Sequence, residues 1–399
     1  MKTKDFIEIE ERFGAHNYHP LDIVIKKAEG VWVEDVEGKR YLDFLAAYSA
    51  VNQGHCHPRL LKVFRQQAAR VTLTSRAFRN DQLPLLCKEL CELTGFPRML
   101  PMNSGAEAVE TAIKASRKWG YEVKGIPADR AEIIVCADNF HGRTTTIVGF
   151  STEKQYQDGF GPFTPGFKII PFGDADALAG AITPNTCAFL VEPIQGEAGI
   201  RVPPSGFLKR AQEICRENHV LLVLDEIQSG LGRTGKMFAH EWEGVKPDAV
   251  IVGKALSGGY YPVSAFLASD EVMSVFRPGD HGSTFGGNPL GAAVAREALK
   301  VLVEEKLVQN SAKLGPWFME QLAKIKSPSI ELVRGKGLWI GMVLNRPARP
   351  YCEALKDERL LCKETHEMVI RFAPPLTIQK RDLSWALRRV EKVFKKMDQ

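Results

Sequence analysis

The chain has 399 residues, enough for two to three domain equivalents of roughly 150 residues, and its 44% hydrophobic and 25% charged residues are ordinary for a globular protein. A net charge of +5 without any run of five basic residues argues against nucleic-acid binding, and the longest apolar stretch, near 220–224, is far shorter than the ~20 residues of a membrane span. The N-terminal residues lack signal or transit character and the eight cysteines include no Cys-x-x-Cys pair, so we expect reduced thiols in the cytoplasm.

The predicted elements of the middle of the chain alternate between helices and short apolar strands. In chain order they are a helix over 105–119, strands over 132–136 and 187–191, a helix over 206–218, and strands over 220–224, 249–252 and 263–267. This alternation is typical of parallel strands joined by helices.

The last hundred residues have a different pattern. It predicts helices over 289–307 and 314–325, a strand over 337–344, and a closing helix with the apolar stripe Leu383, Leu387, Val390 and Phe394. Such a block suits a smaller α+β domain packed on a larger α/β domain.

Two patterns imitate binding motifs. The run 230–235 fits G-x-G-x-x-G and most of a P-loop, but it starts five residues beyond its strand, and Met237 stands where a P-loop has Ser or Thr. A nicotinamide-dependent oxidoreductase built on this run is therefore a remote alternative. His55 and His57 flank Cys56, yet adjacent residues rarely converge on one ion, so we expect a structural turn and no metal site.

Two predicted strands end near residues of opposite charge. Asp225 follows the strand over 220–224, and Lys254 follows the strand over 249–252. Ligands of open α/β sheets bind outside the carboxyl ends of the strands, so a carboxylate and an amine at neighbouring ends would share one cleft. Pyridoxal phosphate requires such a pair, a lysine for its aldehyde and an acid for its pyridine nitrogen. Taken alone, the two residues could equally form a structural ion pair.

Other segments suit the same ligand. The segment Ser104-Gly105-Ala106 opens the helix predicted at 105, and a helix N-terminus with small residues is a ready site for a phosphate dianion. The run 281–289 adds hydroxyl groups that could reach the same phosphate. Phe140 offers a flat ring to the pyridine face, and Arg143 suits bidentate binding of a carboxylate.

Together these segments resemble the class III aminotransferases, which are pyridoxal-phosphate enzymes of fold type I. The resemblance runs from about residue 14 to the C-terminal helix. It rests on the segments 103–107, 140–144, 192–197, 224–235, 253–254 and 281–289, which occur in the order typical of the family. Within the family, segments 14–20, 48–58 and 370–376 are similar to the ornithine aminotransferases. His141, where some members have Trp, and Cys56 are departures that we do not expect to affect the chemistry.

The resemblance implies an architecture and an assembly. A large PLP-binding α/β domain over 46–288 would contain a mainly parallel seven-stranded sheet flanked by helices. The segments 1–45 and 289–399 would form the smaller α+β domain. In this family the residue that corresponds to Thr284 comes from the partner subunit, so the resemblance implies an obligate homodimer with shared sites, small-molecule substrates, and no nucleic-acid or membrane partner.

The resemblance also implies roles for single residues. Lys254 would hold the cofactor and move the proton, while Asp225 would pair with the pyridinium nitrogen and Gln228 with the phenolic oxygen. The implied cofactor-binding residues are Ser104, Gly105, Ala106, Phe140, His141, Asp225, Gln228, Lys254, Ser283 and Thr284. The implied substrate-binding residues are Tyr18, Tyr48, Arg143, Glu197 and Arg371.

The implied reaction transfers the δ-amino group of L-ornithine to 2-oxoglutarate. It gives glutamate and glutamate 5-semialdehyde, which cyclises to pyrroline-5-carboxylate. Glu197 would mask Arg371 while ornithine is bound and would release it to the carboxylate of the keto acid. The nearest alternative is another ω-aminotransferase, acting on N-acetylornithine or 4-aminobutyrate, and Tyr18 discriminates because its hydroxyl needs a free α-amino group. Lys254, Asp225 and Arg143 together argue against a non-catalytic binding protein.

Overall fold

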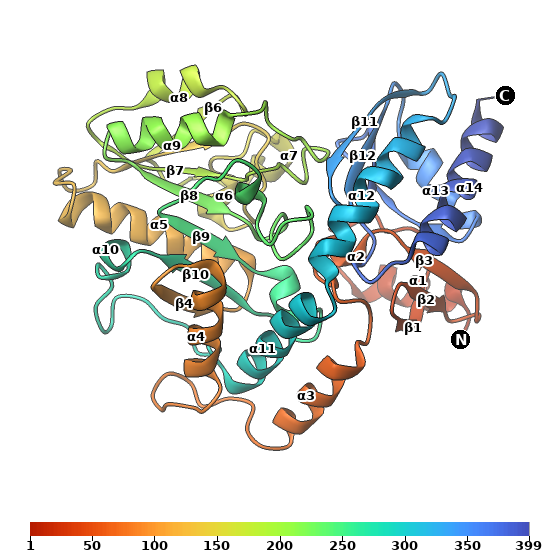
Figure 1. Cartoon of the computed structure of the whole chain (residues 1–399), viewed down its shortest axis with the longest axis horizontal. Helices are drawn as coiled ribbons and strands as arrows, with labels where there is room; N and C mark the ends of the chain where they lie inside the picture. The colour runs from red at the N-terminus through yellow and green to blue at the C-terminus, as the bar shows by residue number, and fades with distance from the viewer. Residues whose placement is uncertain (399) are drawn as a thin grey trace.

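Seven strands form the central sheet of the protein, whose computed structural model describes residues 1–398 (Figure 1). Their order across the sheet is β4 (Arg98–Met102), β10 (Ser264–Ala268), β9 (Ala249–Val252), β8 (Leu221–Asp225), β7 (Thr186–Val191), β5 (Glu132–Cys136) and β6 (Phe167–Ile170). The five strands from β9 to β6 are parallel. The mainly parallel seven-stranded sheet that the resemblance implied is therefore confirmed.

One edge of this sheet differs from the prediction. The strand predicted over 263–267 is β10, and it runs antiparallel to both of its neighbours, β9 and β4. Only the 3₁₀ turn η2 (Lys254–Ser257) and a short loop separate β9 from β10. A parallel connection needs a crossover of a dozen or more residues. The expectation of parallel strands was therefore wrong for this strand.

Helices cover both faces of the central sheet. α5 (Gly105–Glu122) packs on one face through small buried residues such as Ala108, Ala112 and Ala115, which let the helix approach the strands closely. α8 (Ala175–Ala181) and α9 (Phe207–Glu217) lie on the opposite face (Figure 1). The carboxyl ends of the strands stay open between these layers.

The two ends of the chain build two further sheets. One has the order β1 (Ile25–Glu29), β2 (Trp32–Asp35), β3 (Arg40–Asp43) and β13 (Leu360–Leu361), with β13 parallel to β3. The other has the order β11 (Ile330–Lys336), β12 (Trp339–Leu344), β15 (Val369–Phe372) and β14 (Lys363–Thr365). The red N-terminal segment and the blue C-terminal segment accordingly lie side by side in Figure 1.

The long helix predicted over 289–307 is α11 (Pro289–Glu304), which ends before the predicted boundary. α11 ends at Glu304 and α12 begins at Leu307, because Lys306 takes a left-handed conformation with φ of 57° that an α-helix cannot contain. The helix predicted over 314–325 is the second half of α12. The remaining helical elements are α1 (Thr3–Phe13), α2 (Ala46–Ser49), α3 (Pro58–Ala68), α4 (Leu83–Thr94), α6 (Thr145–Val148), α7 (Lys154–Gln157), η1 (Ala239–Trp242), α10 (Asp270–Met273), α11 (Pro289–Glu304), α12 (Leu307–Ala323), α13 (Arg349–Asp357) and α14 (Lys380–Met397).

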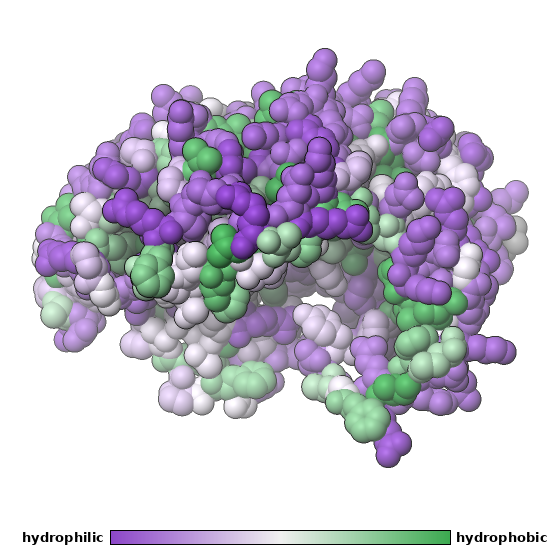
Figure 2. All heavy atoms as spheres, turned by 90° about the horizontal axis from the view of Figure 1, so that it is seen from below, coloured by the Kyte–Doolittle hydropathy of each residue, from purple (hydrophilic) through white to green (hydrophobic). Residues whose placement is uncertain are grey.

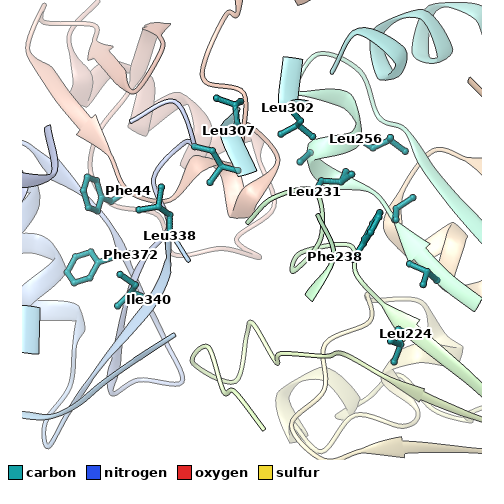
Figure 3. Packing of buried hydrophobic residues seen from close by; sticks show 14 of the residues in the cluster. Phe44, Leu224, Leu231, Phe238, Leu256, Leu302, Leu307, Leu338, Ile340 and Phe372 are labelled. Carbon is teal, nitrogen blue, oxygen red and sulfur yellow. The ribbon is translucent and has the colours of Figure 1, made fainter. Parts of the chain in front are cut away.

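One hydrophobic core connects the central sheet with the terminal sheets. In Figure 3 Phe44 of the N-terminal segment faces Phe372 of β15, and their ring centroids are 5.9 Å apart. Leu231, Phe238 and Leu256 continue the same cluster toward the central sheet. The division at residues 45 and 288 stays a prediction, and α11, which follows the second boundary, packs against α3 and α4.

The outer surface is mostly hydrophilic. Seen from below, it is hollowed between two bodies of side chains, with hydrophobic groups scattered around the hollow (Figure 2). Within residues 1–398, no helix combines the length and the apolar character needed to cross a membrane.

Candidate active site

A cavity of about 190 Å³ lies at the carboxyl ends of β8 and β9, and both Asp225 and Lys254 line it. Asp225 is the last residue of β8, and Lys254 follows the single residue Gly253 after β9. Lys254 has a φ of 44°, in the left-handed region that costs a non-glycine residue about 1 kcal/mol or more. Such strain is common at functional sites, and Lys254 lines the cavity. The structure thus brings the two predicted residues into one site.

Asp225 is paired with a histidine inside the protein. His141 Nδ1 lies 2.7 Å from Asp225 Oδ2, and both side chains are buried. Burial lowers the pKa of His141, but the hydrogen bond and charge of Asp225 outweigh this effect and raise it. His141 Nε2 has no hydrogen-bond partner in the described part of the chain. We expected no chemical effect from His141, which stands where some family members have Trp, so its contact with Asp225 was not predicted.

Glu192 is a third charged residue at a strand end. It directly follows β7, and its carboxylate accepts hydrogen bonds from the backbone N–H groups of Phe140 at 3.0 Å and Gly196 at 3.4 Å. Burial raises the pKa of Glu192 to about 7, so the carboxyl is partly protonated near neutral pH. Sequence reasoning used Glu192 only as part of a motif, although the signal that identified Asp225 applies to it as well.

The N-terminus of α5 opens on the same cavity through Gly105 and Ala106. Ser104 caps the helix: its hydroxyl accepts from the Glu107 N–H at 3.2 Å, and Glu107 accepts from the Ser104 N–H at 2.6 Å. The first N–H groups of a helix have no partner within it. The N–H groups of Gly105 and Ala106 are therefore available to an anion. A Cβ atom at Gly105 would come within 3.0 Å of Ile227.

Gln228 completes the floor of the cavity and is buried. Its side-chain nitrogen has no hydrogen-bond partner within residues 1–398. A Cβ atom at Gly196 would lie 2.2 Å from Gln228 Oε1, so only glycine fits beside this amide. An unpaired buried amide is costly, and a ligand that fills the cavity and accepts from Gln228 would remove this cost.

Arg143 lies beside Phe140, one of the residues that line the cavity. The guanidinium carbon of Arg143 lies 5.5 Å from the centroid of the Phe140 ring and 3.7 Å from that of Tyr156. Arg143 is exposed and forms no ion pair or hydrogen bond with any other residue of 1–398. Tyr156 is a residue that the sequence analysis missed, because it lies outside every segment that carried the resemblance.

Glu197 and Arg371 form a bidentate ion pair between the central sheet and β15. The two guanidinium nitrogens of Arg371 donate to Glu197 Oε1 and Oε2 at 2.9 and 2.8 Å. The side chain of Arg371 is 1% exposed and that of Glu197 24%. Burial opposes the ionisation of Glu197, but the charge and hydrogen bonds of Arg371 lower its pKa to about 2. The predicted pair is therefore closed in this structure.

We expect Glu197→Gln to destabilise the protein by about 2 kcal/mol at pH 7. Folding lowers the pKa of Glu197 from 4.5 to about 2, which corresponds to about 3 kcal/mol of unfolding free energy. The partial exposure of Glu197 to solvent reduces this value. Because the folded pKa is depressed, the contribution is complete above the unfolded pKa and is lost as pH falls toward 2. Urea unfolding measured at pH 7 and pH 4 should show that Glu197→Gln loses less unfolding free energy, relative to the native protein, at pH 4 than at pH 7.

Glu8→Gln is the control for this experiment, since Glu8 forms only an exposed pair with Lys4. It should leave the free energy of unfolding unchanged at both pH values. An equal deficit for Glu197→Gln at both pH values would contradict the assigned pKa.

Tyr48 reaches the ion pair from a left-handed turn. Ala46, Ala47, Tyr48 and Ser49 all have positive φ angles, and Asp43 Oδ1 accepts the N–H groups of Leu45 and Ala46 before the turn. The ring of Tyr48 lies 5.1 Å from the guanidinium carbon of Arg371. Tyr18 is 76% exposed and lines a neighbouring cavity of about 420 Å³ together with Tyr48.

Ser283 and Thr284 do not line the cavity that contains Lys254. Ser283 Oγ accepts from Asn103 Nδ2 at 2.9 Å, and Thr284 is exposed. Within a single chain neither residue therefore reaches the Lys254 cavity, although Ser283 lies against Asn103, next to Ser104.

The two imitations of binding motifs have structural roles. In the run 230–235, the Arg233 guanidinium is buried and donates to the carbonyl oxygens of Leu338 and Pro374 at 3.0 and 2.7 Å, which ties the loop to the C-terminal segment. His55 Nε2 lies 2.8 Å from Asp43 Oδ2. In the described part of the chain, no three His, Cys, Asp or Glu side chains are arranged to hold a metal ion.

The comparisons with known proteins agree on one family. The family described as Aminotransferase class-III matches residues 13–394. The ornithine aminotransferase of Brevibacillus brevis is 63% identical over 393 residues, which are 98% of each chain. Among solved structures, the ornithine aminotransferase of Toxoplasma gondii is 45% identical, with a TM-score of 0.98 over 99% of this chain and 94% of that one. The acetylornithine aminotransferase of Elizabethkingia anophelis is 52% identical, with a TM-score of 0.92 over 99% of each chain. The chain belongs to the class III aminotransferases.

Proposed function

We propose that the protein is an ornithine aminotransferase that uses pyridoxal phosphate to transfer the δ-amino group of L-ornithine to 2-oxoglutarate. The observation that carries the proposal is the different state of two arginines near the site: Arg371, whose charge acts on Lys254, is neutralised by Glu197, whereas Arg143, beside Phe140, has no ion pair within residues 1–398. Ornithine has one carboxylate and 2-oxoglutarate has two. One available arginine and a second arginine that Glu197 can mask therefore suit both substrates. The relatives named ornithine aminotransferase support the same reaction.

The residues of the cavity fit pyridoxal phosphate. The free N–H groups at the start of α5 suit its phosphate, the unpaired Gln228 amide suits its phenolic oxygen, and Asp225 suits its pyridinium nitrogen. When bound, the cofactor supplies an aldehyde that attaches amines and a ring that accepts the electron pair released at the neighbouring carbon. The solved ornithine aminotransferase of Toxoplasma gondii holds the same cofactor, at partial occupancy, in its own active site.

In this proposal Lys254 is the base that handles protons. Burial lowers the pKa of Lys254, although the charges of Glu197 and Asp225 oppose the effect, so its amine gives up a proton more readily than an exposed lysine. Lys254 Nζ would take a proton from the δ-carbon of ornithine. It would then deliver this proton to the carbon that belongs to the aldehyde group of the cofactor. His141 would hold Asp225 in place and share its negative charge.

Arg143 and Tyr18 would orient ornithine. Arg143 would bind the α-carboxylate, so that the δ-amine, at the other end of the molecule, reaches Lys254. The Tyr18 hydroxyl would accept a hydrogen bond from the charged α-amino group, with Tyr48 beside it. The distal carboxylate of 2-oxoglutarate would later take the place of the ornithine carboxylate on Arg143.

Glu197 would decide which end of ornithine reacts. If Arg371 were bare, it would bind the ornithine carboxylate and present the α-amine for reaction. The closed ion pair prevents this binding. With 2-oxoglutarate, Glu197 would rotate away, and the carboxylate beside the keto group would take both donors of Arg371. The 24% exposure of Glu197 leaves it room to move.

We further propose that the enzyme works as a homodimer in the cytoplasm. Ser283 and Thr284 lie outside the cavity of their own chain, and Thr284 is exposed, which suits a contribution to the phosphate site of a partner subunit. All eight cysteines are free thiols, as expected of a protein kept in a reducing compartment.

N-acetylornithine is the second candidate substrate, since the Elizabethkingia anophelis relative is named for it and is 52% identical. An acetyl group on the α-nitrogen removes the charge that Tyr18 would recognise. The ornithine proposal therefore predicts clear discrimination between the two amines.

The test is the absorption spectrum of the purified protein loaded with pyridoxal phosphate. Adding L-ornithine without a keto acid should remove the yellow absorbance, because the amino group passes to the cofactor, and N-acetylornithine should leave the colour unchanged. Loss of colour with N-acetylornithine alone would keep the family and replace the substrate. A protein that cannot take up the cofactor would overturn the proposal.

A further inference from the structure

Tyr156 forms the shortest ring contact of Arg143. Its ring centroid lies 3.7 Å from the guanidinium carbon, close enough for the guanidinium plane to stack on the ring. The corresponding distance to Phe140 is 5.5 Å. Tyr156 comes from α7, thirteen residues after Arg143, so the contact depends on the fold of the segment between them.

These ring contacts are what holds Arg143 in the described structure. Arg143 is exposed and has no ion pair or hydrogen bond with any other residue of 1–398. A free arginine side chain samples many rotamers, so binding a carboxylate costs the conformational entropy of restricting the side chain to one of them. A guanidinium already held against a ring has less conformational freedom to lose and needs less ordering.

The Tyr156 ring is itself anchored. The side-chain amide of Gln157, the next residue, donates to the carbonyl oxygens of Val148, Gly149 and Ser151 at 3.1, 3.3 and 2.8 Å. The rings of Tyr156 and Phe140 pack edge to face, with a centroid distance of 6.2 Å and an interplanar angle of 77°. The ring that contacts Arg143 thus packs on a residue of the cavity wall, and its neighbour Gln157 ties this part of α7 to residues 148–151.

The phenol also stays neutral. Burial raises the pKa of Tyr156, although the charge of Arg143 opposes the effect. A phenolate beside Arg143 would compete with the substrate carboxylate for the guanidinium. A neutral ring supports the arginine without neutralising it.

We propose that Tyr156 is a positioning residue that orients Arg143 and so sets the preference of the enzyme for amines that carry a carboxylate. The inference rests on the proposed function, because it gives Arg143 the substrate carboxylate. It predicts that the ring matters and the hydroxyl does not. It also predicts that the effect appears only with substrates that use Arg143.

The experiment compares Tyr156→Leu with Tyr156→Phe on two amines. L-Ornithine and 1,4-diaminobutane present the same terminal amine, but only ornithine has a carboxylate. Single-turnover loss of the yellow absorbance gives kcat/KM for each, even where the reaction is slow. Y156L should lower the value for ornithine about tenfold, mainly through KM, and should change that for diaminobutane by less than about twofold. Y156F should stay within about twofold of the native enzyme on both amines.

Three outcomes separate the possible failures. An equal loss of Y156L on both amines would overturn the inference, because a damaged cofactor site would explain it. A loss in Y156F as large as in Y156L would also overturn it, since the hydroxyl would then be responsible. A native enzyme that does not react with ornithine would instead overturn the proposed function. Y156M, whose flexible side chain fills more of the space, replaces Y156L if that variant does not fold.

Discussion

Replacing Lys254 with alanine is expected to lower the rate of ornithine transamination by at least about 10⁴-fold. The substitution removes the amine that attaches the cofactor and the base that moves the proton, and no other lysine lines the cavity. The loss should appear in kcat in a steady-state assay with ornithine and 2-oxoglutarate. It should be accompanied by loss of the yellow absorbance of the bound cofactor.

Lys236→Ala is the control for this prediction. Lys236 is exposed, and its amine lies 5.5 Å from the centroid of the Trp242 ring, away from the cavity. Its removal should leave kcat and the spectrum unchanged. A Lys254→Ala enzyme that keeps kcat within about tenfold of the native value would show that Lys254 is not the proton-transfer base.

The residues predicted from sequence were those whose position depends on local pattern. Asp225 and Lys254 follow buried apolar runs, and the carboxyl ends of adjacent parallel strands meet at one edge of a sheet. The start of α5 was predicted in a similarly local way, from the small residues Ser104-Gly105-Ala106 that open a segment with apolar residues at helical spacing. Local chemistry determines these placements, so a sequence is enough to predict them.

The contacts of His141 and Tyr156 were missed because they join separate segments of the chain. His141 lies 84 positions before Asp225, and no spacing rule connects the two. Tyr156 reaches Arg143 only because the segment that carries α7 folds back over Phe140. The direction of β10 was wrong for a related reason: its apolar run is the same in either direction, and only the length of the connection decides.

Asp225→Asn is expected to reduce kcat by about 10³-fold or more while the protein stays folded. A neutral amide has nearly the volume of the carboxylate, so packing is preserved. It cannot hold a proton on the pyridine nitrogen, however, and the ring then loses the positive charge that makes it accept electrons. The variant should still take up the cofactor through Lys254 and the start of α5, so its absorbance should shift rather than disappear.

We also expect Asp225→Asn to lower the pKa of His141, the histidine beside Asp225. Asp225 raises the pKa of His141 against the effect of burial. Without the carboxylate this support is lost, and His141 should stay neutral at lower pH than in the native enzyme. An NMR titration of the His141 ring in the native protein and in Asp225→Asn measures this change independently of turnover.

Asp248→Asn provides the matched control, because Asp248 also contacts β8 but at the other end of the strand. Its carboxylate accepts the backbone N–H of Leu222 at 2.8 Å and does not line the cavity. Its replacement should affect stability alone. If Asp225→Asn kept kcat within about tenfold of the native enzyme, the charge on the pyridine nitrogen would not be what drives the reaction, and Asp225 would be a structural partner of His141. A loss of about 10³-fold with Asp248→Asn unaffected would instead assign the loss to the charge at this one strand end.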